Sequence, residues 1–375
     1  MSLLNGSTLH DFRVTNFKCF EDLNLTQLGQ VNLVVGRNSV GKSSLLEALY
    51  AYRSEDPIDA LDSIASLRGE SWRPSSRGAA ILSLFRTSPR PGSEMLLGPI
   101  DDPLRIRLRA FNRRKDEEGY WRYEPAPDST PSDSLFGQLT TRVLRDASQG
   151  IELQFRGEIL RRMILDSRYR LRKRTATIGM QGPEQQTECV FVGAGGLPVS
   201  ILSSLWDLVA LSASEDEVVE LVRSVFPAVE RISMIGRYEG TEATGERRAF
   251  VKAVGFSEPV PIQRIGDGVG RILGIAIALV NAKNLLLLDE FENGLHYSIH
   301  ESVWRFIFEA SLRLGVQVFV TTHSLDCIKA FSRVAARSDA VGSLIRLEEK
   351  GGKIRAVQVD EKTLEIAERN AVELR

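Results

Sequence analysis

Long hydrophobic runs, a secretory signal and an excess of charge of one sign are all missing from this chain of 375 residues. No stretch reaches the roughly 18 apolar residues that a membrane-spanning helix needs. The first residues lack the basic start and apolar run of a signal peptide. We therefore expect a cytoplasmic protein that does not associate with a membrane. The net charge of −1 excludes a polycation that coats nucleic acid along its whole length.

Cysteines are few and far apart. The chain has only Cys19, Cys189 and Cys327, and no CxxC pair. Neither a disulfide framework nor a cysteine zinc site is expected from this pattern, which fits a reducing compartment. Sustained heptads are also missing, so the sequence predicts no long coiled-coil arm. What remains has the composition of an ordinary globular protein, long enough for two or three domains.

Alternation of strands and helices dominates the last third of the chain. The apolar pattern predicts helices over 272–280, 297–314 and 325–337, and buried strands over 284–288 and 316–321. Such alternation favours a parallel sheet covered by helices. Near the start, 8–17, 22–26 and 31–35 have strand patterns, and a helix is expected over 42–53.

The middle of the chain has a different pattern. Residues 104–109 alternate strictly between apolar side chains and arginine, which predicts a strand, and 120–123 is expected to pair with it. Residues 200–226 are expected to be helical. We predict an α/β fold whose head, 1–155 and 250–375, has a mainly parallel core sheet and an antiparallel β-subdomain. An inserted helical and basic lobe is expected at 156–249.

A glycine-rich loop of the form GxxxxGK[ST] lies between a predicted strand and a predicted helix. Only a glycine-rich turn lets backbone N–H groups approach phosphates at close range. Lys42 can reach the β- and γ-phosphates, and the Ser43 hydroxyl can ligate Mg²⁺. The motif therefore predicts a site for ATP and Mg²⁺. The residues expected to contact the nucleotide are Gly36, Arg37, Asn38, Ser39, Val40, Gly41, Lys42, Ser43 and Ser44.

Two further apolar strands end in polar side chains. Residues 285–288 precede Asp289 and Glu290, and 318–322 precede His323. Parallel sheets place their ligands at the carboxyl ends of their strands. We expect Asp289 to hold Mg²⁺ and Glu290 to polarise the attacking water as general base. His323 is expected to hydrogen-bond the γ-phosphate. The competing interpretation, strand ends that simply face solvent, loses weight beside a phosphate loop.

Together these elements resemble the ABC-type ATPase heads of the RecF, SMC and OLD (overcoming lysogenization defect) group. Phe12 to Phe20 is similar to that group's F/L-x-x-x-N-F-[KR]-x-F opening, and Asp289 to His296 is similar to its DEPE-x-x-LHP acid strand. The match is close to stand-alone ATPases of the OLD-like type. It covers residues 9–55 and 260–335 well and the middle poorly. The resemblance implies a P-loop head that hydrolyses ATP.

The resemblance also implies a homodimer that sandwiches ATP, in which a signature segment meets the nucleotide of the partner. The expected contacts are Gly266, Asp267 and Gly268, in a glycine-rich turn that opens a helix and offers N–H donors. Gly266 stands where the group usually has serine, which predicts a weaker contact and slow turnover. The glutamine loop of such heads has three candidates here, which are Gln138, Gln149 and Gln154.

Three functions stay open on this basis. About 50 residues follow His323, too few for the Toprim nuclease domain that OLD-type proteins often carry. This favours the ATPase subunit of a nucleic-acid-directed or phage-defence system, with a separate nuclease or other effector. The second function is that of a RecF-like DNA-repair ATPase, and the third is a non-hydrolysing ATP-dependent scaffold. A GTPase is disfavoured because no [NT]KxD motif is present.

DNA binding would depend on basic side chains in the middle of the chain, which can neutralise phosphates. The alternative is a solvated face paired with local acids, and the sequence does not decide between the two. The basic residues are Arg105, Arg107, Arg109, Arg156, Arg161, Arg162, Arg168, Arg170, Arg172, Lys173 and Arg174.

Overall fold

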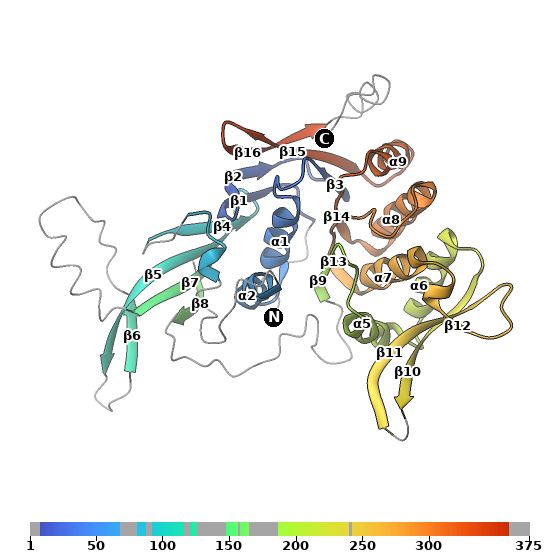
Figure 1. Ribbon diagram of the computed structural model, residues 1–375. Coiled ribbons are helices and arrows are strands. Elements are labelled where there is room, and N and C mark those ends of the chain that lie inside the picture. Colours follow the sequence, from blue (N-terminus) through green and yellow to red (C-terminus); the bar gives the residue numbers. More distant parts are fainter. Residues whose placement is uncertain are drawn as a thin grey trace, which may run out of the picture. The chain divides into compact units, whose positions relative to one another are not determined.

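The computed structural model describes residues 8–67, 81–87, 92–115, 121–125, 148–156, 158–164, 187–239 and 242–359. Contacts divide the chain into two units (Figure 1). Unit 1 comprises residues 1–10, 25–55 and 175–375, and unit 2 comprises 11–24 and 56–174. Unit 1 therefore holds the phosphate loop and both polar strand ends. The lobe expected at 156–249 stays a prediction.

Unit 1 is built on a six-stranded sheet in the order β16-β15-β3-β14-β13-β9. The four pairs from β15 to β9 are parallel, and only β15 and β16 are antiparallel. The mainly parallel core sheet is thus confirmed. Its strands are β3 (Val31–Val35), β9 (Thr187–Val192), β13 (Ala282–Leu288), β14 (Gln317–Thr321), β15 (Gly342–Lys350) and β16 (Lys353–Val359).

Helices cover both faces of this sheet. Figure 1 shows α1 (Lys42–Arg53) on one side and α7 (Asp267–Asn281), α8 (His300–Leu314) and α9 (Leu325–Ala335) on the other. Burial from two sides explains why every residue of β3 and β14 is buried. Helix α7 is apolar nearly all round because it lies inside the core, where 272–279 include seven fully buried apolar side chains.

Two more helices and a small sheet complete unit 1. The segment expected to be helical over 200–226 forms α5 (Val199–Val209) and α6 (Ala213–Val225). Both pack against α7. A three-stranded antiparallel sheet contains β10 (Val229–Glu239), β11 (Glu242–Ala253) and β12 (Val260–Pro261). Short 3-10 helices lie at η1 (Ile262–Arg264) and η2 (Tyr297–Ile299).

Unit 2 is built on a seven-stranded sheet in the order β2-β1-β4-β5-β7-β8, with β6 paired to β5. Its registered pairs are antiparallel, which confirms the antiparallel β-subdomain and the strand expected at 104–109. The unit also holds α2 (Pro57–Leu67). The strands are β1 (Phe12–Phe17), β2 (Phe20–Leu25), β4 (Glu94–Gly98), β5 (Leu104–Lys115), β6 (Trp121–Pro125), β7 (Ser148–Phe155) and β8 (Glu158–Ile164).

In the described ranges, no helix combines the length and the apolar character that a membrane crossing requires.

Candidate nucleotide site

The phosphate loop connects the end of β3 to the start of α1. Gly36 has φ 146°, and a Cβ there would lie 2.5 Å from the carbonyl oxygen of Leu347. Gly41, with φ 99°, is the N-terminal cap of α1 and provides no side-chain cap. Glycine is therefore required at 36 by close backbone approach and at 41 by conformation.

Lys42 folds back over this loop. Its Nζ donates to the carbonyl oxygens of Gly36 (2.8 Å) and Arg37 (3.1 Å). Burial lowers the pKa of Lys42, while the nearby carboxylates of Glu292, Asp289 and Glu290 oppose that shift. A half-buried ammonium group is thus held at the loop, close to the acids that follow β13.

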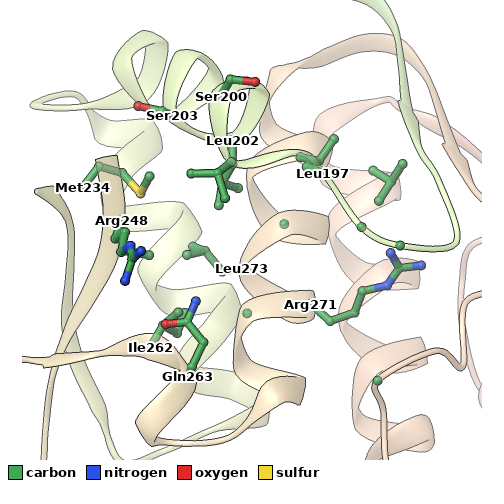
Figure 2. A pocket seen from close by; sticks show the side chains of 18 of the residues that line it. Leu197, Ser200, Leu202, Ser203, Met234, Arg248, Ile262, Gln263, Arg271 and Leu273 are labelled. Atoms are coloured by element: carbon green, nitrogen blue, oxygen red, sulfur yellow. The ribbon is translucent and has the colours of Figure 1, made fainter. Parts of the chain in front are cut away.

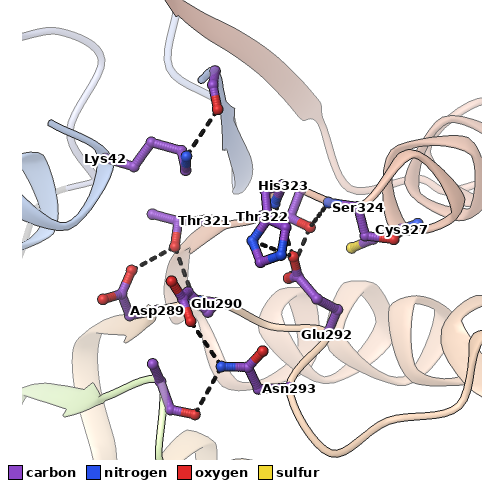
Figure 3. A network of polar contacts seen from close by, with 12 residues as sticks. Lys42, Asp289, Glu290, Glu292, Asn293, Thr321, Thr322, His323, Ser324 and Cys327 are labelled. Carbon is purple, nitrogen blue, oxygen red and sulfur yellow. Dashed lines mark hydrogen bonds and ion pairs between the residues drawn. The ribbon is translucent and has the colours of Figure 1, made fainter. Parts of the chain in front are cut away.

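Asp289 is placed at the carboxyl end of β13 and faces α1. Its Oδ1 accepts a hydrogen bond from the Thr321 hydroxyl (2.6 Å), which Figure 3 shows, and another from the Ser43 hydroxyl (3.1 Å). A carboxylate and a hydroxyl oxygen this close form the kind of hard-oxygen pair that Mg²⁺ accepts beside phosphate oxygens. The residues present therefore fit the divalent cation that the sequence predicts here.

Glu290 has an unusual backbone conformation for a residue with a side chain, with φ 45°. Its N–H donates to the Thr321 hydroxyl (2.8 Å), and its Oε2 accepts from Asn293 Nδ2 (2.8 Å). The same amide lies 3.4 Å from the carbonyl oxygen of Ala194. Left-handed backbone at a residue other than glycine costs on the order of 1–3 kcal/mol and persists only where surrounding contacts determine it. Figure 3 shows these contacts around the carboxylate.

His323 follows β14 and is paired with Glu292, which lies just after β13. Its Nδ1 lies 3.0 Å from Glu292 Oε1, and its N–H donates to the same oxygen (2.8 Å). The Thr322 hydroxyl donates to Glu292 Oε2 (2.8 Å). The His323 side chain is half exposed. Its contact with a γ-phosphate stays a prediction.

Arg271 on α7 contacts the backbone at the carboxyl end of β13. Its guanidinium donates to the carbonyl oxygens of Gly193 (2.8 Å) and Asp289 (3.0 Å) and lies 3.4 Å from that of Glu290. Burial lowers the pKa of Arg271, against the opposing effect of Asp289, Glu292 and Glu290. Helix α7 is thereby connected to the backbone that carries the predicted metal ligand Asp289 and the predicted general base Glu290.

The predicted signature segment, residues 266–268, forms the N-terminus of α7. Gly266 is the N-terminal cap, with φ 146° and no side-chain cap, and a Cβ on Gly268 would lie 3.3 Å from the Gly294 carbonyl oxygen. The side chain of Asp267 lies outside the described residues. Unlike Lys42 and Asp289, this segment does not belong to the network described above. Its contact with a partner's nucleotide stays a prediction.

The candidates for the glutamine loop do not lie in the loop beside the acid strand. Gln149 and Gln154 lie in β7 of unit 2, and Gln138 falls outside the described residues. The strand beside β13 is β9, and the loop that follows it is Gly193–Gly196, which contains no glutamine. Arg271 and Asn293, which also contact the acid strand's end, donate hydrogen bonds to carbonyl oxygens of this loop.

The basic side chains of the middle region are only partly described. Arg105 and Arg107 on β5 both form ion pairs with Glu94 of β4, and Arg156 pairs with Asp102 (2.6 Å). These pairs match the interpretation of a solvated face balanced by local acids. The side chains of 109, 161 and 162 and all of 168–174 lie outside the described residues.

Sequence reasoning did not assign roles to Arg271, Glu292, Asn293, Thr321 or Thr322. Glu292 and Asn293 carried a usable signal, since they follow Glu290 directly in the acid-strand motif. The two threonines end a strand that was expected to reach the site. Arg271 carried no signal, because its partners are backbone carbonyl groups.

Comparison with known families adds a decisive observation. The family described as "AAA domain, putative AbiEii toxin, Type IV TA system" matches residues 31–326, which is most of the chain. The chain belongs to this family. The match spans the phosphate loop, the signature segment and the acid strand of this AAA domain.

Relatives and solved structures agree with that assignment. The AAA-domain chain is 30% identical over 106 residues to Nod factor export ATP-binding protein I of Sinorhizobium fredii (27% of this chain, 31% of the relative). It is 33% identical over 98 residues to an ATP/GTP phosphatase of Helicobacter pylori (24% and 25%). It thus spans about a third or less of the length of these relatives.

A solved SMC head bound to the C-winged helix domain of ScpA covers 96% of this chain and 100% of that structure. The TM-score is 0.51 at 15% identity. The fold is therefore that of ABC- and SMC-type P-loop ATPase heads, a class that uses ATP with Mg²⁺.

Proposed function

We propose that this chain binds Mg-ATP at the phosphate loop and hydrolyses it, and that hydrolysis drives a dimeric switch. The observation that carries the proposal is the convergence of Lys42, Ser43, Asp289 and Glu290 at one end of the parallel sheet. These side chains come from α1 and the end of β13. Their types and spacing match what phosphoryl transfer requires, which is positioning and electrostatic stabilisation.

Each side chain has a distinct task in this mechanism. Lys42 binds the β- and γ-phosphates, and Ser43 and Asp289 hold Mg²⁺, which neutralises charge on the phosphate oxygens. Glu290 accepts a hydrogen bond from the attacking water and polarises it. The contacts that Thr321 and Asn293 make to Glu290 fix where its carboxylate points. His323 contributes a hydrogen bond to the γ-phosphate.

The switch requires two copies of the chain. Gly266, Asp267 and Gly268 at the start of α7 contact the nucleotide held by the partner, so that ATP joins two heads and hydrolysis separates them. Arg271 supports this coupling, because it ties α7 to the backbone of Asp289 in the same chain. Homodimerisation through ATP therefore follows from the proposed mechanism.

The biological setting we favour is an ATPase subunit of a nucleic-acid-directed or phage-defence system, of the OLD-like type, with an effector supplied by another chain. The family description supports a role in such systems, since it refers to a putative toxin of a type IV TA system. Direct DNA binding is less well supported, because Arg105 and Arg107 share Glu94 as their ion-pair partner.

Nucleotide binding and hydrolysis are tested by thermal unfolding and phosphate release with Mg-ATP. For the wild type we expect a higher midpoint in saturating Mg-ATP, since a ligand at 100 times its Kd stabilises by about 2.7 kcal/mol. Lys42→Ala is expected to lose this shift and all phosphate release. Lys329→Ala, an exposed lysine on α9, serves as the matched control and should behave as the wild type. A full shift in Lys42→Ala would refute binding at this loop.

A further inference from the structure

A cavity of about 900 Å³ lies in unit 1 between α5, the β10–β11 hairpin and α7 (Figure 2). Its volume is within the range of small-molecule sites. Leu202, Met234, Ile262 and Leu273 supply an apolar lining. The loop after β9 and the Asn293–Gly294 segment line the end that adjoins the acid strand. No step of the ATPase mechanism uses this cavity.

The charged side chains that line the cavity are all arginines. Three arginines line it, and the described lining residues include no carboxylate. Arg247 is already engaged by an ion pair with Asp207. Arg271 forms no ion pair within the described part of the chain, and its Nε is buried there without a hydrogen-bond partner. A half-buried guanidinium group that lacks a bonded carboxylate favours an anion, which can accept from the N–H groups that its backbone contacts leave over.

The apolar lining and the cationic groups are arranged along the cavity. Figure 2 shows Arg248 and Arg271 on opposite sides of Leu202 and Leu273. Arg248 is exposed, which places it at the mouth, whereas Leu273 is fully buried. A ligand with an acidic group and an apolar body could therefore contact both an arginine and the apolar lining.

Helix α7 leaves space on the side that faces the cavity. A Cβ on Gly274 would meet no atom within 4 Å, and one on Gly270 would meet only Ile262, at 4.0 Å. Glycine inside a helix is less favourable than alanine. Packing against the residues that the structure describes does not explain two such glycines one turn apart, but close approach of a ligand to the helix does.

The cavity wall is connected to the predicted general base. Asn293 lines the cavity and donates to Glu290 Oε2 (2.8 Å), and the same amide lies 3.4 Å from the Ala194 carbonyl oxygen. Arg271 also lines it and donates to the Asp289 carbonyl oxygen (3.0 Å). A ligand that displaces either side chain would move the Glu290 carboxylate.

We propose that this cavity binds a small organic anion, with its acidic group beside Arg271 and its apolar body against Leu202 and Leu273. Occupancy changes the rate of ATP hydrolysis through Asn293 and Glu290. The effect on rate rests on the proposed ATPase function, whereas binding does not depend on it.

Binding is tested with the full chain and the fluorescent probe 1-anilinonaphthalene-8-sulfonate, with Mg-ATP present so that the phosphate loop is occupied. We expect saturable binding that is weakened at least about tenfold in Gly274→Leu, which fills the cavity, and in Arg271→Gln, which removes a charge-assisted bond. Arg305→Gln, a matched change on the exposed face of α8, should leave the affinity unchanged. Unchanged affinity in both folded cavity variants would overturn the site.

The chemical class of the ligand is tested by competition. Phenyl phosphate should displace the probe, while the same concentration of inorganic phosphate, which has no apolar body, should not. Equal displacement by both would overturn the apolar half of the proposal, and no displacement by phenyl phosphate would overturn the anionic half.

The effect on hydrolysis is tested by phosphate release at saturating Mg-ATP. Saturating probe should change the wild-type rate by about fivefold, a typical size for coupling between two sites. Gly274→Leu should show the wild-type basal rate and no response. An unchanged wild-type rate with the cavity occupied would overturn the coupling. If the wild type released no phosphate at all, the proposed function would fail, while the probe titration would still decide the binding site.

Discussion

Several polar side chains of the site hold other side chains rather than a nucleotide. The Thr321 hydroxyl donates to Asp289 and accepts from the N–H of Glu290. Asn293 holds the Glu290 carboxylate, and Glu292 holds the loop that follows β14. The positive φ of Glu290 persists because these contacts surround it. Contacts between individual side chains therefore determine the geometry of the proposed general base.

Asn293→Ala tests that statement. The substitution removes the hydrogen bond to Glu290 Oε2, so the carboxylate loses its fixed direction. We expect the turnover number for ATP to fall about tenfold, the typical worth of one such bond. The affinity for Mg-ATP should not change, because Asn293 makes no contact with the phosphate loop. Phosphate release and thermal shifts measure the two quantities.

A matched control for this variant is Asn24→Ala, since Asn24 is exposed and donates only weakly to Asp22 (3.5 Å). It should keep both the turnover and the affinity of the wild type. Equal turnover for Asn293→Ala and the wild type would show that Glu290 needs no such support.

The site residues that could be predicted are those that belong to a sequence motif or follow an apolar strand directly. Lys42 and Ser43 follow from the loop motif, and Asp289 and Glu290 from their position at the end of an apolar strand. Arg271 did not follow, because its partner Gly193 is 78 positions away. Contacts between a side chain and a distant backbone carbonyl leave no pattern in the sequence.

Among the secondary-structure elements, those buried on both faces were the ones whose positions could be predicted closely. Strands β3, β13 and β14 are buried on both faces over 33–35, 285–288 and 318–320, so each contains an apolar run and was located closely. The break between α5 and α6 was not predicted. It contained a signal, because Ser212 caps α6 and Glu215, three positions later, accepts from the N–H of Leu211.

Two glycines in helical contexts should respond oppositely to alanine. Gly274 lies inside α7, where a Cβ meets nothing, so Gly274→Ala should stabilise the protein by about 0.5–1 kcal/mol. Gly315 ends α8 with φ 69°, so Gly315→Ala should destabilise it by about 1 kcal/mol through backbone strain. Midpoints of thermal unfolding give the two directions. Midpoints that moved in the same direction would refute this account of α7.

At the scale of the whole chain, distant segments contribute to each unit. Gln317, the first residue of β14, is buried and bonds the N–H and carbonyl groups of Leu9, 308 positions away. Unit 1 likewise combines three separate stretches of sequence. The sequence predicted a mainly parallel core sheet and an antiparallel subdomain, but the division of the chain between the two units depends on such distant contacts and was not predictable.

The central claim is that Glu290 is the general base of an ATP-dependent dimer. The most direct measurement is the mass of the wild type and Glu290→Gln by light scattering after gel filtration, each with and without Mg-ATP, with phosphate release followed in parallel. Glutamine keeps the size of the side chain but cannot act as a base. We predict that Mg-ATP holds Glu290→Gln as a stable dimer without phosphate release, whereas the wild type releases phosphate and returns to its mass without nucleotide. Phosphate release at the wild-type rate by Glu290→Gln, or masses that do not respond to Mg-ATP in either protein, would contradict the account.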